Sequence, residues 1–128
     1  MALGELLKDL YRLTVYPGHV VRLFVYVEST RLRTYMAGAA RRYGLDLDTD
    51  DVTLHPTDAA RLPTTAARII GSELAAHHVT ANRVALEQID DTLRLAVYTV
   101  DPIDTGSSRD ATPQHPNELV VVAATSIR

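Results

Sequence analysis

The sequence contains no cysteine and no tryptophan, and such absences narrow the function before any motif is considered. Without cysteine the chain cannot form a disulfide framework, a thiolate zinc site or a cysteine nucleophile. No stretch approaches the ~20 consecutive apolar residues that a membrane-spanning helix needs, and no charged-then-apolar leader opens the chain. We therefore expect a protein that is neither membrane-embedded nor secreted through a signal peptide.

A basic surface is missing as well. The chain has 13 Lys and Arg against 16 Asp and Glu, a formal net charge of −3. Such a chain has no general attraction for a phosphate backbone, so specific nucleic-acid binding is not expected. A length of 128 residues indicates one domain, 1–128, with its own core.

What the sequence does contain is one strong strand that leads directly into one strong helix. In the run from Val20 to Glu28, alternate residues are Val21, Leu23, Val25 and Val27. This period of two predicts a strand with that valine and leucine set facing the core. We expect Leu95, Val97, Val120 and Val122 to join the same core.

The other face of this strand mixes aromatic rings with charged ends. Such a face is suited to contact with a neighbouring element or subunit. With two arginines of the following helix, it forms the predicted interface, made of Arg22, Phe24, Tyr26, Glu28, Arg31 and Arg33.

The predicted helix begins after Ser29-Thr30 and ends at Gly44. Its apolar residues recur at spacings of three and four, Ser29 or Thr30 is placed as N-cap, and Gly44 as the left-handed terminator. A second amphipathic helix is predicted before Tyr16-Pro17-Gly18, and a third over Thr64–His78.

The remaining pattern predicts further strands. Val52–His55 reads as a short edge strand, 83–89 and 92–100 as a hairpin, and Leu119–Ala124 as a final strand. The order α-β-α-(β)-α-β-β-β predicts an α+β fold, with a mixed, mainly antiparallel sheet of four to five strands covered by two to three helices. The polar segment 101–117 is expected to be a flexible loop or arm.

Two polar groups could bind a metal. The segment Asp46–Asp51 begins like a calcium loop, but Asp51 stands where a glycine is needed and Thr57 where a bidentate glutamate is needed, which favours a turn-forming acidic loop. Adjacent His77 and His78 diverge on a helix and do not chelate together.

A histidine site built from separate loops remains an alternative to the structural interpretation. Its candidate residues, which would serve a small ligand-binding or hydrolytic α+β protein, are His55, Asp58, His77 and His115. No Gly-x-Ser-x-Gly elbow and no glycine-rich phosphate cradle is present. We expect no cofactor, no metal and no catalytic activity.

Residues 15–44 resemble part of a known family. The turn Tyr16-Pro17-Gly18, the strand Val21–Glu28 and a helix rich in alanine and arginine are similar to the strand-to-helix segment of tail-terminator and tail-completion proteins of tailed viruses. That resemblance implies a homo-oligomeric ring subunit of a neck or tail, with a hexamer as the candidate assembly. Its partners would be further copies and neighbouring structural proteins, with nucleic acid at most passing through the ring.

It also implies a location in the virion or in the host cytoplasm. The predicted helix Thr64–His78, with the hairpin after it, departs from that family's order. A second resemblance is to roadblock-type adaptor domains, through Val84–Gln88, Leu93–Val97 and the final apolar strand. It implies a dimeric adaptor instead of a ring.

Overall fold

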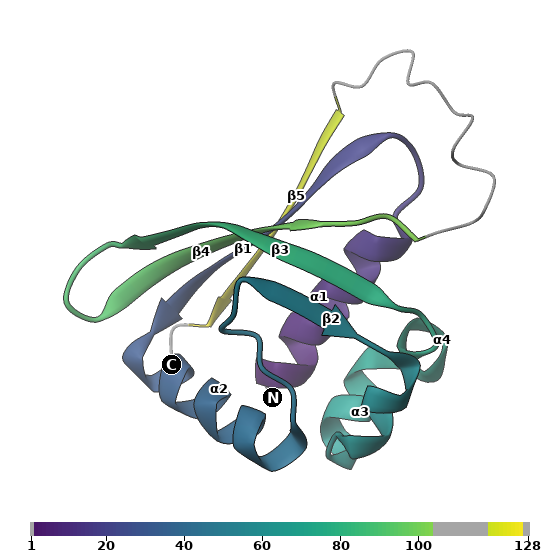
Figure 1. Ribbon diagram of the computed structural model, residues 1–128, viewed down its shortest axis with the longest axis horizontal. Coiled ribbons are helices and arrows are strands. Elements are labelled where there is room, and N and C mark those ends of the chain that lie inside the picture. Colours follow the sequence, from purple (N-terminus) through teal and green to yellow (C-terminus); the bar gives the residue numbers. More distant parts are fainter. Residues whose placement is uncertain (1, 104–117, 127–128) are drawn as a thin grey trace.

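The computed structural model describes residues 2–103 and 118–126, and in them the chain has the predicted α+β fold (Figure 1). The order of elements also agrees with the prediction. The elements are α1 (Ala2–Val15), β1 (Val20–Ser29), α2 (Thr30–Tyr43), β2 (Asp51–Leu54), the 3-10 helix η1 (Pro56–Arg61), α3 (Thr64–Ile70), α4 (Ser72–Ala75), β3 (Val79–Gln88), β4 (Leu93–Val100) and β5 (Glu118–Ser126).

The five strands form one sheet in the order β2-β3-β4-β1-β5. β1 pairs antiparallel with β4, which places Phe24 opposite Tyr98, and parallel with β5. β3 pairs antiparallel with both β4 and β2. The predicted mixed, mainly antiparallel sheet is thus confirmed.

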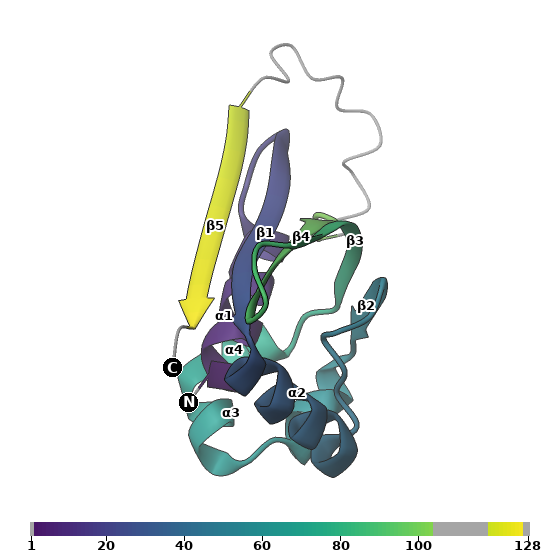
Figure 2. The same cartoon turned by 90° about the vertical axis from the view of Figure 1, so that its left-hand side faces the viewer.

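The helices lie on one face of this sheet, as the two views in Figures 1 and 2 show together. α1 is the central helix of this layer and contacts β1, β3, β4 and β5 as well as α2, α3 and α4. Its leucines are almost fully buried, at 0–2% exposure; they are Leu3, Leu6, Leu7, Leu10 and Leu13. No described helix covers the opposite face.

α2 begins and ends at the residues that its sequence predicts. The hydroxyl of Ser29 accepts a hydrogen bond from the backbone N–H of Leu32 at 3.0 Å, and Gly44 closes the helix with φ 72°. A side-chain acceptor at the N-cap satisfies an amide that has no partner inside the helix. Both signals are local, which is why they could be read correctly from the sequence.

The predicted facing of β1 is wrong. Phe24 and Tyr26 are 1% exposed and pack under the helices, whereas Val21 is 47% exposed on the uncovered face. Leu23, Val25, Val27, Leu95 and Val97 share that face and are half-buried. Val120 and Val122 lie in β5, whose side chains are outside the described residues. The strand itself was predicted correctly from its period of two. Both faces of β1 carry enough apolar residues to form a core, and the larger aromatic rings are the ones that fill the space below the helices.

The predicted third helix is two short helices instead of one. Gly71 separates α3 from α4 with φ 86° and ψ 150°, a backbone conformation that side chains with a Cβ avoid. The chain after α4 turns into β3 at Val79, so this strand begins before the predicted position 83. An isolated glycine in a helical pattern does not by itself reveal such a break.

Only the start of the predicted arm 101–117 lies within the described residues. The backbone N–H of Asp101 donates to the carbonyl of Thr80, and that of Ile103 to the carbonyl of Thr14, each at 2.9 Å. These bonds attach the exit from β4 to β3 and α1. Positions 104–117 are outside the described residues.

Candidate functional site

Four members of the predicted interface are buried inside the chain. Arg22 is 6% exposed, and its guanidinium donates to backbone carbonyls of Leu13 at 2.9 Å, Gly18 at 3.0 Å and Val20 at 3.1 Å. It also donates to the carbonyl of Tyr16. Arg22 therefore ties the end of α1 and the following turn to β1, and is not available to a neighbouring subunit.

Next along the same face lies an aromatic cluster. The ring centroid of Phe24 lies 5.3 Å from that of Tyr26 and 6.2 Å from that of Tyr98. The two tyrosine rings are stacked, with their centroids 6.2 Å apart. Burial raises the pKa of Tyr26 well above its ordinary value, and the nearby hydroxyl of Tyr98 adds to this. This cluster is the centre of the core beneath β1 and β4.

Glu28 is the last residue on the buried face of β1, and it is charged. Only 1% exposed, it receives a hydrogen bond from Nε of Arg94 at 2.9 Å and lies 3.5 Å from the hydroxyl of Tyr26. Nε of Arg33 is at ion-pair distance, 3.4 Å, but makes no hydrogen bond to any described residue. A buried carboxylate needs such compensation, because an unpaired charge in the core is strongly unfavourable.

The acidic loop after α2 is clamped to the sheet by arginines. Asp48 accepts from Arg83 at 2.8 Å and from Arg94 at 3.0 Å, and Asp50 accepts from Arg83 at 3.0 Å. Burial by itself would raise the pKa of Asp48, but the two guanidinium groups outweigh it and lower that pKa. Tyr98 donates to the carbonyl of Leu47 as well. Asp48 and Asp50, whose oxygens a calcium loop would direct at the ion, instead bind arginine side chains of the sheet.

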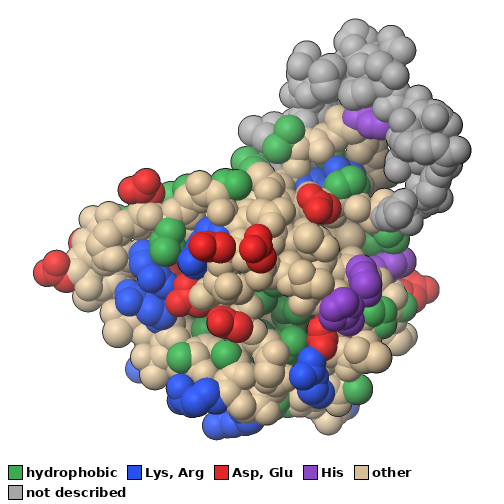
Figure 3. All heavy atoms as spheres, in the orientation of Figure 1, with side chains coloured by type: hydrophobic (Ala, Val, Ile, Leu, Met, Phe, Trp, Pro, Cys, Tyr) green, Lys and Arg blue, Asp and Glu red, His purple; other side chains and the backbone are tan. Residues whose placement is uncertain are grey.

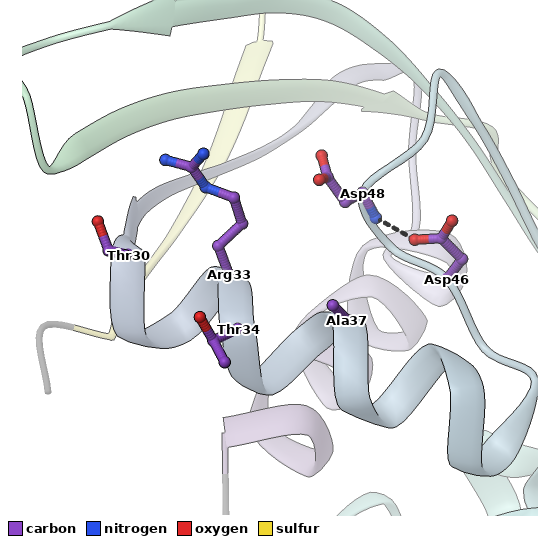
Figure 4. A pocket seen from close by; sticks show the side chains of 6 residues that line it. All are labelled: Thr30, Arg33, Thr34, Ala37, Asp46 and Asp48. Carbon is purple, nitrogen blue, oxygen red and sulfur yellow. Dashed lines mark hydrogen bonds between the residues drawn. The ribbon is translucent and has the colours of Figure 1, made fainter.

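A surface cleft of about 430 Å³ lies between α2 and this loop (Figure 4). Arg33 extends from α2 toward the sheet, while Asp48 faces it from the loop and Asp46 lies beside Asp48. Asp46 accepts a hydrogen bond from the backbone N–H of Asp48 at 2.9 Å. The other lining residues are Thr30, Thr34 and Ala37. None of the six lining residues is a histidine or lysine, so the charged groups of the cleft are one guanidinium and two carboxylates.

The predicted histidine group is only partly brought together. Asp58 accepts a hydrogen bond from the backbone N–H of His55 at 2.8 Å and pairs with Arg61, and these bonds lower the pKa that burial alone would raise. His78, not His77, meets His55. His77 lines a cleft of about 540 Å³ beside His78. His115 is outside the described residues.

The meeting of His55 and His78 is the polar contact that sequence reasoning missed. Nδ1 of His55 lies 2.8 Å from Nε2 of His78, and the rings are in a T-shaped arrangement. Both residues are exposed. The two residues lie 23 positions apart, so their spacing in the sequence did not indicate a contact. Predicting it would have required the register in which β2 and β3 pair. Within the described residues, no group of three His, Asp or Glu could hold a metal ion.

Three of the six exposed large hydrophobic residues in the described part of the chain lie on the outer half of the β3–β4 hairpin. Val84 is 58% exposed, Ile89 53% and Leu86 38%, whereas Val79 and Ala81 at the other end of β3 are fully buried. The hairpin tip is also acidic, with exposed Glu87, Asp90 and Asp91. Figure 3 shows acidic side chains at this free end of the sheet.

The outward side of α2 has the opposite charge. Arg31, Arg41 and Arg42 are exposed there, Arg33 is half-buried, and Tyr35 is 37% exposed. Figure 3 shows basic side chains along the lower edge of the molecule, where α2 runs. Of the predicted interface, Arg31 and Arg33 are thus the residues that remain accessible.

Comparisons with protein-family models, with curated proteins and with solved structures found no match for this chain. No helix among the described residues is long and apolar enough to cross a membrane.

Proposed function

We propose that this protein is a noncatalytic structural subunit that assembles with copies of itself into a closed ring, as in the tail-terminator proteins that residues 15–44 resemble. The observation that supports it is the exposed apolar end of the β3–β4 hairpin. Three side chains there, Val84, Leu86 and Ile89, are 38–58% exposed. Apolar groups gathered at one exposed end gain stability when a neighbouring protein removes them from water.

The occupant we propose for this hairpin is the outward side of α2 in the next copy. The hairpin tip carries Glu87 and Asp91, and α2 carries Arg31 and Arg41, all exposed. Acidic and apolar groups would then meet basic groups and the ring of Tyr35. Complementary charge of this kind selects the partner and orients it.

Two different patches that bind each other form a heterologous contact, which closes into a ring when its rotation divides a full turn. In a virus neck or tail, such a ring would contact neighbouring structural proteins and let nucleic acid pass. The buried arginine network around Glu28 and Asp48 would keep α2, the acidic loop and the hairpin in a constant arrangement in every copy.

The test is the native mass of the purified protein, measured by light scattering or native mass spectrometry. We expect a single discrete mass that corresponds to more than two copies of the 14.1 kDa chain. The double variant Glu87→Lys/Asp91→Lys should lower the mass, and so should Arg31→Glu/Arg41→Glu. Combining all four substitutions should restore assembly, because the charges are then exchanged and complementary again.

Arg12→Glu is the matched control, since Arg12 is exposed on α1 and belongs to neither patch. Each variant is checked for folding by circular dichroism. A wild-type chain that stays monomeric at high concentration contradicts self-association. A strict dimer contradicts the ring and favours an adaptor of the roadblock type.

A further inference from the structure

We propose that His55 and His78 bind one divalent transition-metal ion, with Nδ1 of His55 and Nε2 of His78 as its protein ligands and water at its remaining positions. The geometry favours Cu²⁺ or Ni²⁺ over Zn²⁺. This site is independent of the proposed ring contact.

The register of β2 and β3 explains why the two histidines meet. Thr53 pairs with Thr80 and Leu54 with Val79, which is the last pair of these strands, and His55 and His78 follow directly beyond it. Directly opposed residues have Cβ atoms about 4.5–5.5 Å apart, within reach of two imidazoles for one ion. Leu54 and Val79 are buried, and alternation turns the two histidines to the outside, where both are exposed.

The separation of the two nitrogens fits a particular coordination geometry. It is 2.8 Å. Ligand nitrogens about 2.0–2.1 Å from a metal are about 2.8–3.0 Å apart at a right angle and about 3.3–3.4 Å apart at the tetrahedral angle. The observed distance therefore matches two adjacent corners of a square or tetragonal site, the arrangement that Cu²⁺ and Ni²⁺ adopt with nitrogen and oxygen ligands.

The surroundings allow an ion to replace the hydrogen bond. In the free protein one ring donates the hydrogen that lies between the nitrogens. When a metal binds, this hydrogen moves through solvent to the outer nitrogen of the same ring, so both rings stay neutral. The backbone of His55 is held by Asp58 at 2.8 Å, and the adjacent cleft of about 540 Å³ gives room for water ligands.

The experiment titrates Cu²⁺ alone into the full chain near neutral pH, with calorimetry for affinity and electron paramagnetic resonance for the ligands. We expect one equivalent to bind with two imidazole nitrogens in the spectrum. His55→Gln and His78→Gln should each weaken binding by more than about tenfold. His77→Gln is the matched control, because His77 lines the same cleft as His78 but does not meet His55, and this variant should bind as the wild type does.

Zn²⁺ titrated in the same way should bind more weakly than Cu²⁺. Wild-type affinity in His55→Gln or His78→Gln, loss of binding in His77→Gln, or a wild-type spectrum without imidazole nitrogen would overturn the proposal. Circular dichroism of each variant separates loss of the ligand from loss of the fold.

Discussion

Glu28 and Arg94 stand directly opposite each other in β1 and β4, and their side chains form an ion pair on the helix-covered face of the sheet, with Nε of Arg94 2.9 Å from Oε1 of Glu28. Glu28 is 1% exposed and the Arg94 side chain 17%. Through Asp48, the same arginine reaches the loop after α2 at 3.0 Å. One cross-strand pair thus joins the sheet to the loop that borders the α2 cleft.

Removing one member of this pair should destabilise the fold strongly. We expect Arg94→Met to lower the free energy of unfolding by about 3–5 kcal/mol, because Glu28 would remain as a buried charge without its main partner. The double variant Glu28→Leu/Arg94→Met should recover part of that loss. Urea denaturation measures both, with Arg12→Met as an exposed control. Equal losses in the single and double variants would contradict the coupling.

Which face of β1 is buried can be tested with one substitution on each of its two opposite faces. Phe24→Ala should cost about 3–5 kcal/mol, since it leaves a cavity among Tyr26, Tyr98 and the helices. Val21→Ala, on the uncovered face, should cost less than about 1 kcal/mol. Thermal or urea unfolding compares the two. A larger loss from Val21→Ala would mean that the valine face is the core.

Acidification should weaken the fold through Asp48. Because its pKa in the folded chain is below the ordinary value, the stability that its ionised form contributes is complete above the unfolded pKa of about 3.9. That contribution is lost as the pH falls through the lower folded pKa. Asp48→Asn lacks it, so the stability difference between wild type and this variant should shrink from about pH 5 downward.

The measurement is urea unfolding at a series of acidic pH values. Asp51→Asn is the control, since Asp51 is exposed and has no ion pair among the described residues. A difference between wild type and Asp48→Asn that stays constant with pH would contradict this role of Asp48.

The break between α3 and α4 gives a matched pair of glycine substitutions. Gly71→Ala should destabilise by about 1–3 kcal/mol, because φ 86° with ψ 150° is strained for alanine. Gly38→Ala, inside α2 with no atom within 4 Å of its new Cβ, should stabilise by about 0.5–1 kcal/mol. The melting temperatures should therefore move in opposite directions. A stabilising Gly71→Ala would mean that one continuous helix forms.

The histidine group shows how a candidate site can be half predicted. His55 and Asp58 lie three positions apart, so a turn brings their segments together, and they are in contact. His78 joins them only because β2 and β3 pair in one particular register. The sequence prediction named His77 instead of His78, because it extended one helix over both residues, whereas α4 ends at Ala75 and the chain enters β3 at Val79.

Local signals decided which elements form. The leucine spacing of α1, the Ser29 cap and Gly44 end of α2, and the period of two in β1 each act within a few residues, so sequence alone determined them. Which face of β1 is buried was decided by tertiary structure. Phe24, Tyr26 and Tyr98 fill the space beneath the helices, and Arg22 and Glu28 find partners from distant segments that satisfy their charges. From the sequence alone, a charged residue is predicted to lie on the surface, because its partner is not known. Only the tertiary structure brings that partner close enough to pair with it.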